Sequence, residues 1–74
     1  MKKLTEIEKG GEGRIKSLEG GRRFTAQLRT MGLKEGSKLR VIAIEPFGGP
    51  VVVKSHNTTI TLGRGKAEKI IMEE

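Results

Sequence analysis

The sequence predicts a mainly β fold, a small barrel or sandwich of about five short strands with one inserted helix. Two observations carry this prediction. Eleven glycines lie singly and in pairs along the 74 residues and separate short apolar runs, which is typical of short strands joined by tight turns. One segment alone has a helical period. The length fits a single domain over residues 1–74, whose small core allows only marginal stability.

Five segments have the composition of strands, namely 13–18, 39–44, 51–56, 59–62 and 70–72. In the second, Leu39 and Val41 alternate with Arg40, as in a half-buried strand. Ile42 and Ile44 break that alternation, so the far end of this strand is expected to be bulged or covered on both faces. Between the third and fourth strands, 57–58 is expected to form a two-residue hairpin turn. Residues 4–7 are expected to pack on the core as a lead-in.

The helical segment is 22–31. Its apolar residues Phe24, Leu28 and Met31 recur at helical spacing and are predicted to form one buried stripe. Gly32 follows where a left-handed C-terminal cap belongs, and Leu33 is placed to contact Leu28. A helix of this length does not persist alone in water, so it must lie on the sheet. A helical turn is also expected near 66–69.

The formal net charge of +6 is spread along the chain without a run of like charges. A solvated basic surface, a nucleic-acid partner and the negative face of a membrane are all compatible with such a distribution. The absence of cysteine excludes disulfides and thiolate metal sites. Because the longest apolar run is only four residues, 41–44, and the first residues do not form a signal peptide, a cytoplasmic protein is expected.

The sequence contains no catalytic triad, no carboxylate pair with identifiable roles and no cofactor fingerprint, so no enzymatic activity and no cofactor are expected. His56, the one histidine, is expected to lie on the surface beside the hairpin turn. It is a weak candidate ligand for Fe²⁺ or another divalent transition metal, most plausibly shared between two chains. The glycines around Arg64 are interpreted as a strand-to-helix connector in preference to an anion site.

Phe47 is one of only two aromatic residues, and it sits in the stretch Pro46-Phe47-Gly48-Gly49-Pro50. This is turn chemistry, so the ring is expected near a loop tip. It either folds back over one end of the core or faces outward as a contact for a partner. Since no other aromatic side chain is free to stack on bases, nucleic-acid binding has only the charge in its favour.

The order of these elements resembles the FeoA family, ferrous iron transport protein A, over nearly the whole chain. The matching residues are Gly10, Gly13, Ile15, Leu28, Met31-Gly32-Leu33, Gly36, Pro46-Phe47-Gly48-Gly49-Pro50-Val51, Leu62-Gly63-Arg64, Ala67 and Ile70. The resemblance implies an SH3-like barrel with an inserted helix, in the stand-alone form of the family, because no helix-turn-helix precedes the barrel.

The resemblance also implies a function and a partner. It points to a cytoplasmic accessory protein that supports ferrous iron uptake by contacting a membrane transporter with a GTPase-like domain, and so lies at the inner face of the membrane through its partner. The contact surface is expected to include Phe47, Gly48 and Gly49. The basic helix face of Arg22, Arg23 and Arg29 is a second candidate for this contact. Two alternatives stay open, a metal-responsive regulatory module and a basic nucleic-acid-binding barrel, as does self-association through exposed strand edges.

Overall fold

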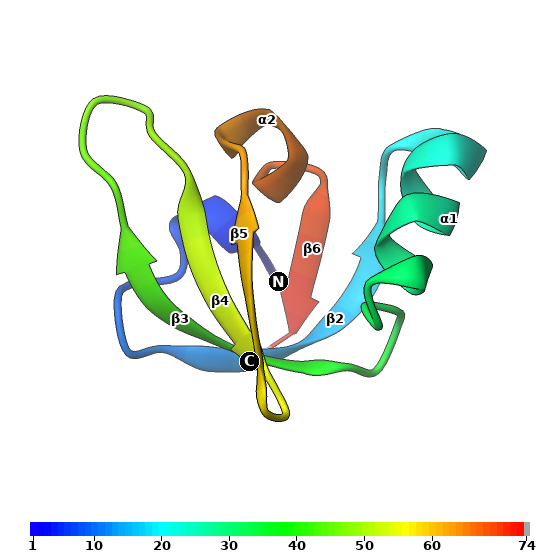
Figure 1. The fold of residues 1–74 in the computed structure, drawn as a ribbon, viewed down its shortest axis with the longest axis horizontal. Coiled ribbons are helices and arrows are strands. Elements are labelled where there is room, and N and C mark those ends of the chain that lie inside the picture. Colours follow the sequence, from blue (N-terminus) through cyan, green and yellow to red (C-terminus); the bar gives the residue numbers. More distant parts are fainter. Residues whose placement is uncertain (74) are drawn as a thin grey trace.

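The computed structural model describes residues 1–73, which form one curved antiparallel sheet with a helix at its side (Figure 1). The order of the six strands found in these residues is β1-β6-β2-β3-β4-β5. The mainly β prediction is confirmed. Along the chain the elements are β1 (Lys2–Lys3), the 3₁₀ helix η1 (Leu4–Glu6), β2 (Glu12–Leu18), α1 (Gly21–Thr30), β3 (Lys38–Ile44), β4 (Val51–Ser55), β5 (Thr58–Leu62), α2 (Arg64–Ala67) and β6 (Ile70–Glu73).

The core lies inside the curve of the sheet, and every main element contributes to it. Leu4 and Ile7 of the lead-in are buried there, as predicted, and η1 contacts both α2 and β6. The buried apolar side chains are Leu4, Ile7, Ile15, Phe24, Leu28, Leu33, Leu39, Val41, Val51, Val53, Ile60, Leu62, Ala67, Ile70 and Met72. None of the helices in residues 1–73 is long and apolar enough to cross a membrane.

Two bulges let the sheet curve around this core. In β3 the pairing with β4 shifts between Val41 and Ala43, which explains why the alternation breaks at Ile42. In β2 the pairing with β6 shifts between Ile15 and Ser17. Side chains three residues apart lie on opposite faces of a regular strand, so this shift is what lets both Ile15 and Leu18 pack on the core.

The helix α1 ends as predicted. Gly32 adopts φ 88°, and its N–H donates to the carbonyl of Arg29 at 2.9 Å. The N–H of Leu33 reaches back to the carbonyl of Leu28, also at 2.9 Å, which completes a Schellman motif. Leu28 and Leu33 are both fully buried. The prediction that Met31 is buried was wrong, because this residue follows the last helical residue as the C-cap and is 37% exposed.

Other elements also differ from the sequence prediction. The turn between β4 and β5 is His56-Asn57, one residue earlier than expected, because Ser55 pairs with Thr58. The second helical turn is α2 at Arg64–Ala67, two residues earlier than expected. A sixth strand, β1, was missed because its two exposed lysines carry no apolar pattern, and only the pairing of Lys2 with Met72 and Lys3 with Ile71 defines it.

Candidate functional site

The loop between β3 and β4 carries the most exposed large apolar side chain in the described part of the chain. Phe47 is 103% exposed, so its ring does not pack on the core. Its φ is 57° and that of Gly48 is 74°, the pair of left-handed residues that a type I′ turn needs. The N–H of Gly49 closes this turn on the carbonyl of Pro46 at 3.1 Å. The structure thus decides between the two interpretations of Phe47: the ring faces outward.

The loop is held from its base. The N–H of Glu45 donates to the carbonyl of Pro50 at 3.0 Å, which extends the hairpin up to the turn. Arg64, at the start of α2, donates from Nη2 to the carbonyl of Glu45 at 3.3 Å. Two prolines further restrict the backbone. This hydrogen bonding fixes the position of the Phe47 backbone, although the ring itself touches nothing that holds it. Sequence reasoning did not identify Arg64 as a brace, since the contact spans 19 residues.

The backbone of Phe47 is strained at the tip of the loop. A left-handed backbone is unfavourable by about 1–2 kcal/mol for residues other than Gly, Asn and Asp. Pro46 and Gly48 beside it are exposed, and Ile44 at the end of β3 is 37% exposed. An exposed aromatic ring in a strained position contributes nothing to folding, so this loop is a candidate surface for contact with another molecule.

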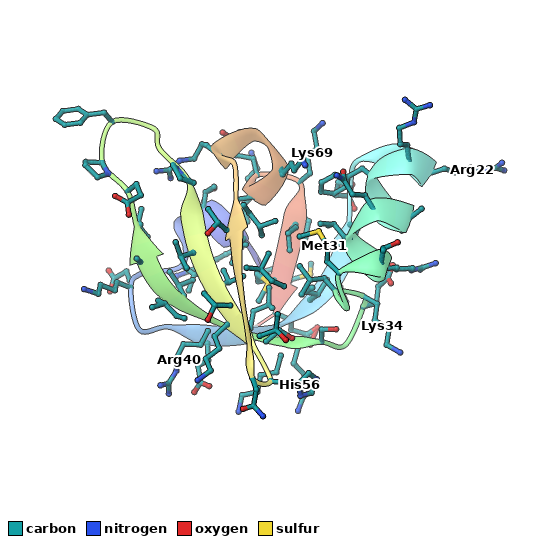
Figure 2. All side chains as sticks on the ribbon, viewed as in Figure 1. Arg22, Met31, Lys34, Arg40, His56 and Lys69 are labelled. Carbon is teal, nitrogen blue, oxygen red and sulfur yellow. The ribbon has the colours of Figure 1, made fainter. Side chains whose placement is uncertain are left out.

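The predicted basic helix face is divided in the structure. Arg22 and Arg23 lie exposed in the first turn of α1, and Arg22 projects away from the molecule (Figure 2). Positive charge is unfavourable at a helix N-terminus, so these two residues do not stabilise α1 through its dipole. Arg29 lies in the last turn and forms an ion pair with Glu35 at 3.1 Å. In Figure 1, α1 lies at one side of the molecule and the β3–β4 loop at the other, so the helix arginines and Phe47 do not form one patch.

A second feature lies at the opposite end of β3 and β4 from the Phe47 loop. It is a groove of about 620 Å³ that we call the basic groove. Its lining residues are Glu12, Arg14, Lys34, Glu35, Gly36, Ser37, Lys38, Arg40, Lys54 and His56. Arg40, His56 and Lys34 mark its extent along the lower edge of the molecule in Figure 2. The sequence analysis missed it, because its basic residues are scattered through the chain and only strand pairing collects them.

His56 lies at this groove and is exposed, as predicted. It occupies the first position of its turn with φ 56°, a position for which glycine is usual. In residues 1–73 no three His, Cys, Asp or Glu side chains come together as metal ligands. Metal ligation by His56 stays a prediction.

Comparison with known proteins relates the chain to one family. The family model described as FeoA domain matches residues 2–74. A curated protein of Methanocaldococcus jannaschii, described as "Putative Fe(2+) transport protein A", is 35% identical over 74 residues, which are all of this chain and 88% of that protein.

Solved structures agree with this relationship. The chain is similar to iron(II) transport protein A of Clostridium thermocellum, with 34% identity and a TM-score of 0.88 over 96% of this chain and 44% of that one. It shares its fold with a zinc complex of Stenotrophomonas maltophilia FeoA, described as a prokaryotic SH3 domain protein. That match has 22% identity and a TM-score of 0.80 over 95% of this chain and 87% of that one. The SH3-like architecture is confirmed.

Proposed function

The chain belongs to the FeoA family, and on that premise we propose that it is a cytoplasmic accessory protein of ferrous iron uptake. It acts by contact on a membrane iron transporter, through the GTPase-like domain that the transporter presents to the cytoplasm. In this proposal iron is the cargo of the partner. The accessory protein supplies a rigid surface, and the transporter keeps the chemistry and the pathway for the ion.

The observation that carries the proposal is the fully exposed ring of Phe47 on its braced loop. Aromatic side chains that insert into a pocket of the partner are the commonest residues to dominate the affinity of a protein–protein contact. A loop already fixed by hydrogen bonds and prolines loses little conformational entropy on docking, so more of the burial energy of the ring appears as affinity. Phe47 therefore fits an apolar pocket on the partner, with Ile44 and Pro46 beside it at the rim.

Co-purification with the transporter tests this role. The protein is expressed with the transporter, and the complex is recovered from detergent-solubilised membranes for the native chain and for Phe47→Asn. Asparagine tolerates the left-handed backbone, so this variant removes the ring and keeps the turn. We expect the recovered complex to fall at least tenfold. Phe47→Leu, which keeps an apolar side chain at the same place, serves as the matched control and should retain most of the binding.

Recovery of the Phe47→Asn complex at the native level would show that the ring is not the contact. The same samples allow a second measurement, the rate of GTP hydrolysis by the transporter's soluble domain with and without the accessory protein. If the rate of GTP hydrolysis is the same with and without the accessory protein, the protein binds the transporter without controlling hydrolysis. The proposed role is then limited to docking.

A further inference from the structure

We propose that the basic groove is a second binding site and that its ligand is an acidic polypeptide segment, a short extended run of Asp and Glu. This inference does not depend on the proposed function, because the groove lies at the opposite end of the β3–β4 hairpin from Phe47 and shares no residue with that loop.

The first argument is that the sheet pairs like charges in the groove. Arg14 of β2 lies directly opposite Lys38 of β3, and Arg40 of β3 lies directly opposite Lys54 of β4. Like charges in direct cross-strand pairs destabilise a sheet, whereas opposite charges at the same positions stabilise it. The same register also places Glu12 opposite Arg40 and Glu73 opposite Arg14, so each arginine has one like and one opposite neighbour. Lys38 and Lys54 each face an arginine, and an anion that lies across these residues would reduce their repulsion.

The second argument is that the protein's own carboxylates leave this charge unbalanced. Glu12 is shared between two cations, at 3.6 Å from Lys38 Nζ and 3.5 Å from Arg40 Nη2. Glu35 also lines the groove, but its charge is taken by Arg29 of α1. Within residues 1–73, Lys34 and Lys54 form no ion pair, and both are exposed.

Arg14 is positioned by the backbone. Its Nη1 donates to the carbonyl of Gly36 at 3.0 Å, which holds the guanidinium at the groove wall. Glu73 lies opposite Arg14 on β6, but its carboxylate forms an ion pair with Lys16 at 3.6 Å. The guanidinium keeps further N–H donors for a carboxylate, and planar pairing with carboxylates is what distinguishes arginine from lysine. One wall of the groove is therefore already organised for an anionic side chain before any ligand arrives.

The lining favours a polypeptide over the other polyanions. Among the described residues that line the groove, His56 carries the one aromatic ring, so a single strand would find no row of rings on which successive bases could stack. None of these residues has an apolar side chain, and a concave charged surface does not offer a bilayer the projecting apolar residues of an interfacial anchor. The cations of β2, β3 and β4 span about 10 Å across the strands, a distance that three residues of an extended segment cover. Carboxylates on such a segment would reach across all three strands.

The test uses a fluorescein-labelled hexaglutamate peptide and fluorescence anisotropy at several salt concentrations. Lys54→Glu reverses one charge inside the groove, and Lys66→Glu makes the same change on exposed α2, outside it. We expect Lys54→Glu to weaken binding at least fivefold and Lys66→Glu less than twofold. Glu12→Gln, which frees two groove cations from their shared carboxylate, should tighten binding about threefold.

Three results would overturn the proposal. Equal weakening by Lys54→Glu and Lys66→Glu would mean that only the net charge matters. Weaker or unchanged binding in Glu12→Gln would contradict the role of the unbalanced cations. Tighter, groove-dependent binding of a 20-base-pair DNA duplex, or of vesicles containing phosphatidylserine, would assign the groove to phosphate groups instead. Circular dichroism of each variant separates loss of the site from loss of the fold.

Discussion

The two phenylalanines of this chain should respond to substitution in opposite directions. Phe24 is 8% exposed in the buried stripe of α1, with Lys69 Nζ 5.7 Å from its ring centroid, whereas Phe47 is 103% exposed. We therefore expect Phe24→Ala to destabilise the protein and Phe47→Asn to stabilise it. Both substitutions remove a phenylalanine ring, one from the core and one from the surface.

The magnitudes follow from burial and backbone conformation. Replacing a buried Phe by Ala costs about 3–5 kcal/mol through lost transfer energy and the cavity left behind. A chain of 74 residues has a free energy of unfolding of about 4–11 kcal/mol, so Phe24→Ala removes a large share of it. Phe47 has no burial to lose, and an asparagine at φ 57° relieves a left-handed strain of about 1 kcal/mol. For a domain of this size that gain raises Tm by about 4–8 °C.

Thermal and urea unfolding followed by far-ultraviolet circular dichroism measures both effects, because the chain has no Trp or Tyr to report by fluorescence. Urea curves of both variants should keep the native m-value, which shows that the same surface unfolds. A loss of 2 kcal/mol or more in Phe47→Asn would refute the reasoning, since it would mean that the ring packs on the barrel and that the loop is not an outward contact.

Three further predictions concern single positions. Gly32→Ala should lower the free energy of unfolding by about 1–2 kcal/mol, because its φ of 88° suits glycine alone. Gly65→Ala, inside α2 with open space around a Cβ, should raise it by about 0.5–1 kcal/mol, and urea titration compares the two. Ser55→Ala should raise it by about 1 kcal/mol, because the buried Ser55 Oγ has no hydrogen-bond partner in residues 1–73; an unchanged or lower Tm would contradict this. The pKa of Glu35 lies below its ordinary value of 4.5 because its own backbone N–H and then Arg29 stabilise the carboxylate. The ion pair of Glu35 with Arg29 therefore stabilises the fold at pH values above 4.5, and this effect is lost as the pH falls through the lowered pKa. Arg29→Gln should raise the pKa of Glu35 part of the way back, as NMR titration of its side chain would show.

The sequence by itself determined the β class, the approximate strands and the end of α1. These features rest on local chemistry, on alternation along a strand, on helical spacing and on glycine at a left-handed stop, and each is readable within a few residues. The resemblance to the FeoA family rested on the order of these elements and on the glycines between them, and the family match over residues 2–74 confirms it. The missed boundaries lie where the local pattern is weak, as in β1, which exists only through its pairing with β6.

Only the tertiary structure decided what the surface offers. Whether Phe47 covers the core depended on the brace from Arg64 and on a turn that points the ring away, and both involve the path of the chain around the loop. The basic groove needed the pairing of β2, β3 and β4, which brings Arg14, Lys38, Arg40 and Lys54 to one face. Basic residues that are far apart in the chain leave no local pattern in the sequence. The positive charge that they create together depends on strand register, which is fixed only when the sheet forms around its core.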